Sequence, residues 1–200
     1  MDITIVILAA GKGSRMGNIK QLLPYKDSNL LQHVIYQALN SKGSRVYCVL
    51  GANANIILKT VIGEQVTFIH NPNWESGLSS SIVVAVNHFK NLEKFPSAVL
   101  VMLADQPNVG SNFINKLIDL YQINENQIIA SAYGNKNGVP AIFPNLYFED
   151  LLNLKGDKGA RLFLKNNQEN VLAITPEYLE ILNDIDSQED YENLIKNESL

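Results

Sequence analysis

The chain has 200 residues, a hydrophobic fraction of 46% and a formal net charge of −4 at pH 7. This length suits one domain with a substantial buried core, so we expect a single domain over residues 1–200. The acidic balance argues against a nucleic-acid partner, which usually requires a basic face. The single cysteine, Cys48, cannot form an intrachain disulfide, and the first apolar run is too short to span a membrane and lacks the basic flank of a signal peptide. These features predict a cytoplasmic protein with no membrane partner.

Short apolar runs alternate with helix-like segments, which predicts an α/β fold with crossover helices. Strands are predicted over residues 3–9, 45–51, 66–70, 98–104 and 127–133. Helices are predicted between them, at about 29–41, 53–62, 79–92 and 111–123. Later segments indicate a short strand at 141–143, helices at 145–152 and 158–166, a strand at 170–174 and a last helix within 186–197. The irregular chain after Tyr133 favours a mixed sheet over simple parallel winding.

The first predicted strand runs into AAGKGSRMGNIK, residues 9–20, a loop with three glycines, basic residues and no acid. Glycine lets the backbone approach an anion and point N–H groups at it. The Walker A spacing is absent, and the dinucleotide spacing fails because Met16 replaces the third glycine. The remaining interpretation is a triphosphate cradle in which Arg15 and Lys20 neutralise the leaving pyrophosphate. A tight glycine turn with two solvated bases is the alternative.

The segment LADQP, residues 103–107, places Asp105 directly after an apolar strand. A triphosphate site needs Mg²⁺ to bridge its oxygens, and carboxylates are the usual protein ligands of Mg²⁺. An aspartate that caps a helix or forms a turn is the alternative. Because ligands bind beyond the carboxyl ends of strands in open sheets, we expect residues 9–20, 71–81 and 104–107 on one rim.

A second group of carboxylates lies in NDIDSQED, residues 183–190. Asp186 could complete a metal site with Asp105, or it could cap the last helix, as Ser187 equally could. Asp184 and Asp190 are interpreted as surface acids.

Three further segments contain groups that suit ligand binding. In NPNWESGLSSS, residues 71–81, small polar groups could contact a base or phosphate, although serine capping also explains them, and Trp74 is interpreted as a loop anchor. In GDKGAR, Arg161 follows two glycines and could meet an anionic acceptor or simply face solvent. GVPAIFP, residues 138–144, could line an acceptor pocket. The histidines show no metal-ligand spacing, and hydrolase and zinc motifs are absent from the sequence.

Together, LAAGKGSRMG and the following Lys20 resemble the signature of nucleotidyltransferases that activate small phosphorylated compounds with a nucleoside triphosphate. Six segments occur in the order of that family: LAAGKGSRMGNIKQLLP (8–24), NPNWESGLSSS (71–81), LADQP (103–107), GVPAIF (138–143), LKGDKGAR (154–161) and DIDSQED (184–190). Within this superfamily the chain is most similar to the molybdenum cofactor cytidylyltransferases. LAAG, rather than LAGG, is similar to the cytidylyl branch, and LADQP and GDKGAR are similar to the molybdopterin branch.

This resemblance implies a fold and a set of site residues. The fold is a Rossmann-like three-layer α/β/α sandwich with a mostly parallel, mixed central sheet. The implied nucleotide-binding residues are Leu8, Ala9, Ala10, Gly11, Lys12, Gly13, Ser80 and Ser81. Arg15 and Lys20 are the implied catalytic phosphate ligands, and Asp105 and Asp186 the implied ligands of Mg²⁺. The implied acceptor-side residues are Gly138, Pro140 and Arg161, although Val139 stands where several relatives carry a polar residue or histidine.

The implied reaction transfers CMP from CTP to the terminal phosphate of a small acceptor, first of all molybdopterin, and releases pyrophosphate. A molybdenum hydroxylase that receives the product is the implied protein partner. A sugar phosphate or methylerythritol phosphate is the alternative acceptor. A non-catalytic nucleotide-binding protein that delivers a cofactor is the alternative of another class. A dehydrogenase is disfavoured by the glycine spacing and by the missing acid after the second strand.

Overall fold

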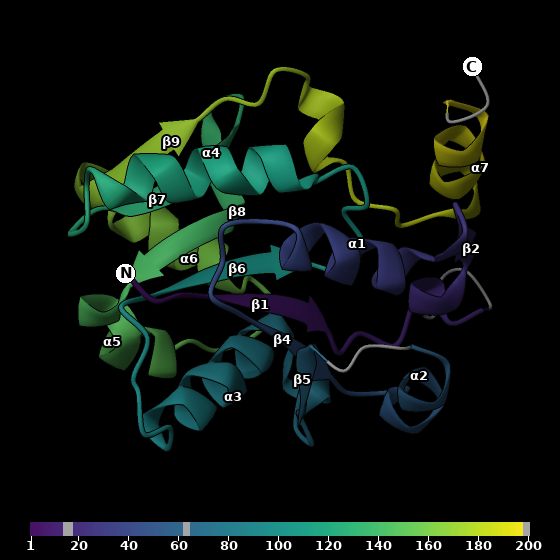
Figure 1. The fold of residues 1–200 in the computed structure, drawn as a ribbon, viewed down its shortest axis with the longest axis horizontal. Coiled ribbons are helices and arrows are strands. Elements are labelled where there is room, and N and C mark those ends of the chain that lie inside the picture. Colours follow the sequence, from purple (N-terminus) through teal and green to yellow (C-terminus); the bar gives the residue numbers. More distant parts are fainter. Residues whose placement is uncertain (14–17, 62–64, 198–200) are drawn as a thin grey trace.

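The computed structural model describes residues 1–13, 18–61 and 65–197. Within these residues, a seven-stranded sheet has the order β5-β4-β1-β6-β8-β7-β9 (Figure 1). The bounds of its strands are β1 (Ile3–Ala9), β4 (Arg45–Leu50), β5 (Val66–His70), β6 (Ala98–Leu103), β7 (Ile128–Tyr133), β8 (Lys136–Pro144) and β9 (Val171–Ile174). Strand β8 pairs antiparallel with β6 and β7, and the other pairs in the sheet are parallel. This topology confirms the predicted mostly parallel, mixed sheet.

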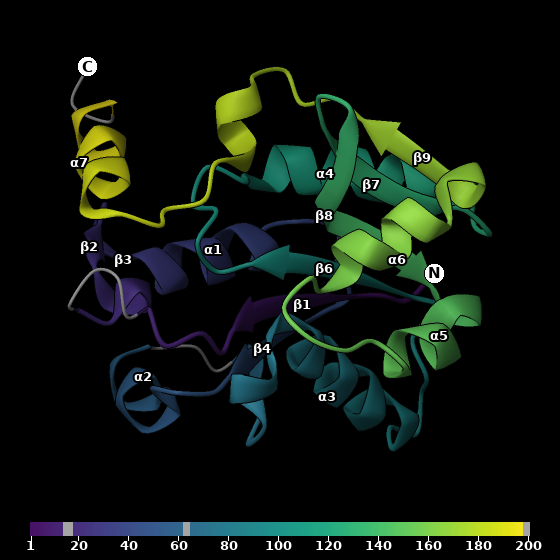
Figure 2. The ribbon, with the colours of Figure 1, turned by 180° about the vertical axis from the view of Figure 1, so that it is seen from behind.

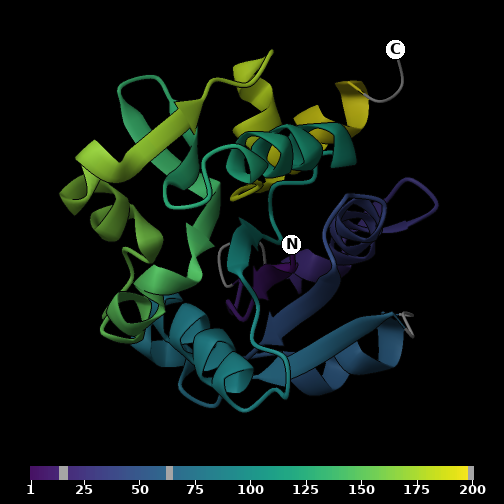
Figure 3. The same cartoon turned by 60° about the vertical axis from the view of Figure 1, so that its left-hand side comes forward.

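Helices cover both faces of the sheet. The helices are α1 (Leu30–Leu39), α2 (Ala54–Thr60), α3 (Leu78–Lys90), α4 (Ser111–Gln122), α5 (Phe148–Leu152), α6 (Ala160–Asn166) and α7 (Gln188–Asn197). Buried side chains of α1, α2 and α4 pack in one core cluster, and those of α3, α5 and α6 pack in another. Figure 1 shows α1 and α4 in front of the sheet, and Figure 2, the view from behind, shows α6 in front of it. The turned view in Figure 3 shows α4 and α3 on opposite sides of the strands. The three-layer sandwich is therefore confirmed.

Strand β1 lies within this core, since all seven of its residues are buried. Ile5 and Ile7 belong to one core cluster, whereas Val6 and Leu8 belong to the other, as the alternation of side chains along a strand requires. Such a strand, apolar on both faces, is typical of a sheet covered by helices on each side. Its last residue, Ala9, leads directly into the glycine loop at the rim of the sheet.

Most predicted elements have the predicted bounds to within a few residues, but β8 is longer than predicted. We predicted a strand at 141–143, whereas β8 spans Lys136–Pro144 because it pairs with β6 on one side and β7 on the other. A short hairpin of β2 (Pro24–Tyr25) and β3 (Ser28–Asn29) was not predicted. In the described part of the chain, no helix is both long and apolar enough to cross a membrane.

The start of α7 decides between the two candidate caps. The amide of Asp190 donates to Ser187 Oγ at 3.1 Å, and the amide of Ser187 donates to Asp190 Oδ2 at 2.8 Å. This reciprocal pair is a capping box in which Ser187 is the cap and Asp190 the third helical residue. The carboxylate of Asp186 is therefore left for other partners, and Asp190, interpreted as a surface acid, has a capping role.

Helix α7 lies at one end of the molecule beside the β2–β3 hairpin (Figures 1 and 2). The hydroxyl of Tyr191 donates to the carbonyl oxygen of Pro24 at 2.6 Å. Leu194 and Ile185 pack in a small apolar cluster with Leu23. The C-terminal segment that carries Asp184 and Asp186 is thus attached to the segment that follows Lys20.

Candidate active site

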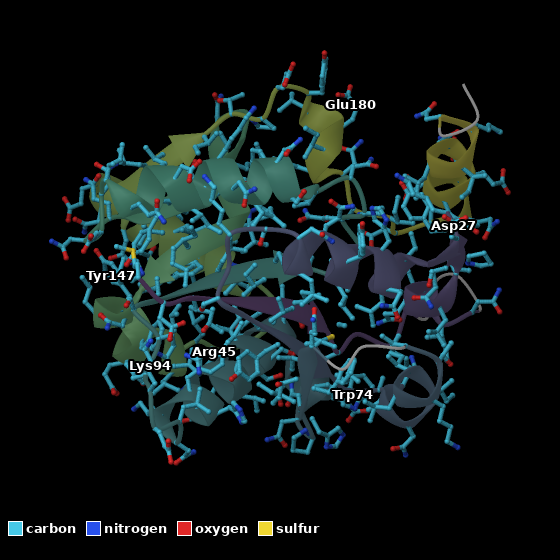
Figure 4. The ribbon with its side chains drawn as sticks, viewed as in Figure 1. Asp27, Arg45, Trp74, Lys94, Tyr147 and Glu180 are labelled. Carbon is cyan, nitrogen blue, oxygen red and sulfur yellow. The ribbon has the colours of Figure 1, made fainter. Side chains whose placement is uncertain are left out.

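A cavity of about 610 Å³ lies at the carboxyl ends of β1 and β6. It brings together the glycine loop, the segment before α3 and the C-terminal segment, which are far apart in the sequence. The lining includes ten of the site residues expected from the sequence: Leu8, Ala9, Ala10, Gly11, Lys12, Gly13, Lys20, Ser81, Asp105 and Asp186. It also includes Gln21, Trp74, Glu75, Gly77, Leu78, Leu103, Ala104, Asp157 and Asp184. Figure 4 shows Trp74 well away from Arg45 and Lys94.

Some of the expected site residues are not among the described residues that line the cavity: Ser80, Gly138, Pro140 and Arg161. Ser80 Oγ donates to the carbonyl oxygen of Gly77 at 2.8 Å and accepts from Asn71 Nδ2 at the same distance. These bonds give Ser80 a structural role in the first turn of α3. Arg15 lies outside the described residues.

Hydrogen bonds from Gln21 and Ala52 fix the backbone at the start of the glycine loop, residues 9–11. Gln21 is buried, and its Nε2 donates to the carbonyl oxygens of Ala9 at 3.1 Å and Gly11 at 3.0 Å. The carbonyl oxygen between them, that of Ala10, accepts from the amide of Ala52 at 3.1 Å. Three consecutive carbonyl groups are therefore engaged before any ligand binds. Such preorganisation lowers the entropic cost of binding.

Gly13 allows Lys20 to pack closely against the glycine loop. Gly13 has φ +63°, a left-handed conformation that favours glycine, and a Cβ there would lie 3.3 Å from Lys20 Cβ. A larger residue at this position would strain the loop and crowd the base of the Lys20 side chain.

The segment GDKGAR reaches the cavity through Asp157 rather than Arg161. Gly77 has φ +94°, and a Cβ at Gly77 would lie 2.3 Å from Asp157 Oδ1. The amide of Ser79 donates to the carbonyl oxygen of Gly156 at 3.1 Å. The loop before α6 therefore packs on the start of α3, which places Asp157 in the cavity lining while Arg161 is exposed.

Lys20 lies between two carboxylates. Its Nζ donates to Asp105 Oδ2 at 2.8 Å and to Asp186 Oδ1 at 3.0 Å, and its side chain is only 14% exposed. Burial alone would lower the pKa of Lys20, but the charges and hydrogen bonds of the two carboxylates outweigh burial and raise it. Lys20 therefore stays protonated at neutral pH.

Asp184 adds a third carboxylate to this group. Asp184 Oδ1 accepts from Gln106 Nε2 at 2.9 Å. Partial burial and the charge of Asp105 raise the pKa of Asp184 to about 6, against the lowering effect of the Gln106 hydrogen bond. Asp184 is solvent-exposed, as a surface acid would be, but it lines the cavity and takes part in the charge balance. The prediction of an exposed acid is therefore confirmed, but it did not place Asp184 at the cavity.

The arrangement leaves one strong acceptor without a partner. Asp105 Oδ1 is buried and, within the described part of the chain, accepts no hydrogen bond. Among the described residues no group of three or more His, Cys, Asp or Glu side chains is arranged to hold a metal ion. Instead, the ammonium of Lys20 is the cation between Asp105 and Asp186. A free carboxylate oxygen beside a second carboxylate is nevertheless the donor set that a hard divalent cation prefers.

The opposite end of the molecule has the reverse balance of charge. There, Asp2 Oδ2 lies 2.7 Å from Arg45 Nη2 and 3.7 Å from Lys94 Nζ, so one carboxylate is paired with two cations. Figure 4 shows Arg45 and Lys94 close together at that end. The Asp2 group is thus electrostatically satisfied, whereas the Lys20 group carries an excess of negative charge. Such an excess at a cavity is suited to recruiting a further cation.

Comparison with known proteins identifies the family of this chain. Residues 5–171 match the family described as the MobA-like NTP transferase domain. The chain belongs to this family. It is therefore a nucleotidyltransferase of the MobA-like family.

Relatives within the family carry different names. The chain is 31% identical to nicotine blue oxidoreductase of Paenarthrobacter nicotinovorans over 82% of this chain and 81% of that protein. It is 29% identical to the purine catabolism protein PucB of Bacillus subtilis, over 94% and 93% of the two chains. It is 36% identical to the molybdenum cofactor cytidylyltransferase of Escherichia coli over 42% of this chain and 44% of that protein. The predicted resemblance to the nucleotidyltransferases is confirmed by the match to the MobA-like NTP transferase family.

Solved structures confirm the fold. The Rv0371c homologue from Mycobacterium sp. strain JC1 superposes with a TM-score of 0.85 at 28% identity, covering 98% of this chain and 96% of that chain. A manganese complex of Rv0371c from Mycobacterium tuberculosis superposes with a TM-score of 0.77 at 26% identity, covering 98% of each chain.

Sequence reasoning missed Gln21, Asp157 and Asp184 as residues of the cavity. Asp184 could have been found, because it lies two residues before Asp186 and alternate residues of an extended segment share a face. Asp157 and Gln21 depend on how loops pack against each other. No pattern in the sequence marks such contacts.

The raised pKa of Asp184 predicts a pH-dependent gain in stability for Asp184→Asn. The carboxyl ionises near pH 3.8 when free but near pH 6 in the folded protein, so its ionisation disfavours folding. This penalty is absent below about pH 4, grows as the pH rises to 6 and is complete above it. We expect Asp184→Asn to raise the unfolding free energy at pH 8 by about 0.5–1 kcal/mol, allowing for solvent screening. We expect no gain at pH 4.

Urea unfolding of Asp184→Asn and the wild type at both pH values is the measurement. Equal stability at pH 8, or a gain that persists at pH 4, would contradict the assigned surroundings of Asp184.

Proposed function

We propose that this protein transfers CMP from CTP to the terminal phosphate of a small phosphorylated acceptor, with molybdopterin as the favoured acceptor, and releases pyrophosphate. The observation that carries this proposal is the position of Lys20, between Asp105 and Asp186 and beside the held glycine loop. A charged lysine, a backbone cradle and carboxylates with a free oxygen are the groups that a metal–triphosphate complex requires.

In this proposal, Asp105 and Asp186 would hold Mg²⁺. The buried, unpartnered Asp105 Oδ1 supports this role, and a manganese complex of the similar Rv0371c supports a divalent cation in a related chain. When bound, Mg²⁺ neutralises part of the charge on the triphosphate and on the leaving pyrophosphate.

Lys20 exchanges partners in the proposed reaction. In the structure its ammonium balances the carboxylates of Asp105 and Asp186. With Mg²⁺ held by those carboxylates, Lys20 would be free to donate to phosphate oxygens, and Arg15 is proposed to do the same. In the structure, burial opposes the charge of Lys20, but the two carboxylates outweigh burial and raise its pKa, so Lys20 is an ammonium before it meets the phosphates. Leu8, Ala10 and Ser81 are proposed to surround the nucleoside, since they line the same cavity.

The acceptor supplies its own nucleophile, because a terminal phosphate is ionised at neutral pH. One of its oxygens forms a bond to the α-phosphorus of CTP, and the bond from that phosphorus to the bridging oxygen breaks to release pyrophosphate. The protein's contribution is to orient the reactants and neutralise charge. Gly138, Pro140 and Arg161 are proposed to contact the part of the acceptor that extends beyond the cavity. A molybdenum hydroxylase is the proposed recipient of the product.

Support for CTP and molybdopterin comes from the LAAG sequence and from similarity to the molybdenum cofactor cytidylyltransferase of Escherichia coli. The chain covers 44% of that protein, and relatives with other names match over longer spans. A sugar phosphate or methylerythritol phosphate acceptor, and a protein that binds nucleotide without turnover, are therefore outcomes to be distinguished by experiment.

The test is pyrophosphate release with Mg²⁺ and each of CTP, GTP, UTP and ATP, with and without molybdopterin. We expect release with CTP that requires molybdopterin. Binding of CTP without release would leave the site intact but overturn the acceptor. A parallel assay of nicotinamide dinucleotide oxidation addresses the redox activity named for one relative, and we expect none.

Lys20→Met should have opposite effects on turnover and on metal binding. We expect pyrophosphate release to fall roughly 100-fold or more, the scale for losing one charge stabiliser. We expect Mn²⁺ alone to bind more tightly, because the ammonium no longer competes for Asp105 and Asp186. Steady-state kinetics and electron paramagnetic resonance titration measure the two effects.

Lys42→Met is the matched control, since Lys42 is an exposed lysine that binds Asp119 at 2.6 Å, and we expect it to change neither quantity. Near-normal turnover in Lys20→Met would remove Lys20 from the mechanism.

A further inference from the structure

Gln106 is a fully buried side chain directly after Asp105, with 1% of its surface exposed. Its Nε2 lies 2.8 Å from Tyr133 Oη, 3.0 Å from the carbonyl oxygen of Leu182 and 2.9 Å from Asp184 Oδ1. The carbonyl and the ionised carboxylate can only accept hydrogen bonds, so the amide nitrogen must face them. Gln106 Oε1 is buried and, among the described residues, has no hydrogen-bond partner. The orientation of the Gln106 amide therefore satisfies its N–H donors, and it leaves Oε1 without a hydrogen bond among the described residues.

These three acceptors belong to different parts of the fold. Tyr133 ends β7, and its hydroxyl donates to the carbonyl oxygen of Val139 in β8. Leu182 ends the 3₁₀ helix η6 (Leu179–Leu182), and Asp184 follows it in the segment that leads to α7. Figure 2 shows this C-terminal segment running from η6 to α7 at the end of the molecule. Gln106 thus joins the sheet to the segment that carries Asp184 and Asp186.

A backbone hydrogen bond also joins the segment of Asp184–Asp186 to Asp105. The amide of Ile185 donates to the carbonyl oxygen of Asp105 at 2.9 Å. The carboxylates of Asp105, Asp184 and Asp186 repel one another, so this segment needs compensating donors to stay near Asp105. Lys20 supplies a charged donor to Asp186, and Gln106 supplies a neutral donor to Asp184. A neutral donor holds a carboxylate without bringing a cation that would compete with a metal ion.

We propose that Gln106 is a positioning residue that holds the segment of Asp184–Asp186 against Asp105, and thereby sets the spacing at which Asp105 and Asp186 bind a divalent cation. This inference rests on the metal site of the proposed function. Groups that orient metal ligands typically affect metal affinity about 10–100-fold when removed.

Two variants separate the donor of Gln106 from its packing. Gln106→Met keeps the length of the side chain and removes its donors, and Gln106→Glu keeps the shape and replaces the donors by acceptors. Asn108→Ala is the matched control, because Asn108 lies two residues away and makes a long, exposed contact of 3.4 Å to the carbonyl oxygen of Glu180.

The first measurement is hydrogen exchange of the Ile185 amide. We expect both Gln106 variants to accelerate it roughly tenfold or more, the scale of losing one buried hydrogen bond. We expect unchanged exchange in β1 and β6, and no change in Asn108→Ala. Unchanged exchange at Ile185 would overturn the proposal. Acceleration throughout β1 and β6 would also overturn it, since Gln106 would then be an ordinary core residue.

The second measurement is the dissociation constant of Mn²⁺ alone, by electron paramagnetic resonance. We expect Gln106→Met to raise it roughly tenfold or more, whereas Asn108→Ala leaves it unchanged. Unchanged Mn²⁺ affinity despite faster exchange would overturn the positioning role. This assay needs no turnover, so Mn²⁺ binding without pyrophosphate release in the wild type would refute the proposed function and leave the inference standing.

Discussion

The ion pairs of Lys20 with Asp105 and Asp186 connect three parts of the chain that are distant in sequence. Asp105 lies just beyond β6, Asp186 lies before α7, and Lys20 is the last residue of the glycine loop and the first of the short helix η2 (Lys20–Leu22). The charges are not balanced, since Asp184 adds a further carboxylate and Asp105 Oδ1 has no partner among the described residues. We propose that the remaining negative charge favours the binding of another cation.

Lys20 and Asp105 are each followed in the sequence by a buried glutamine. Gln21 follows Lys20 and binds the carbonyl oxygens of the glycine loop, and Gln106 follows Asp105 and binds Asp184. Both glutamines use Nε2 as a donor to several acceptors, and both have a buried Oε1 that is unpartnered within the described residues. Neutral amides can fix geometry without changing the net charge of a site. The charged groups then remain available for the ligand.

The sequence was informative where a single segment determines the outcome. The apolar, β-branched run of β1 predicted its own bounds, and the glycine loop and LADQP indicated the two sides of the cavity. The capping of α7 by Ser187 could not be decided, because Asp186 and Ser187 are equally good caps until the partner of Asp186 is known. Asp157 was missed for a similar reason. Its place in the cavity depends on the packing of the loop at Gly156 against Gly77, which are far apart in the sequence.

We propose that the carboxylates and Lys20 together bind a metal–triphosphate complex, not a free triphosphate. Calorimetric titration of CTP into the protein, with Mg²⁺ and again with a chelator, tests this claim most directly. We expect at least roughly tenfold tighter binding with Mg²⁺, because without it the excess carboxylates repel the triphosphate and keep Lys20 occupied. Equally tight binding of CTP in the presence of the chelator would contradict the account.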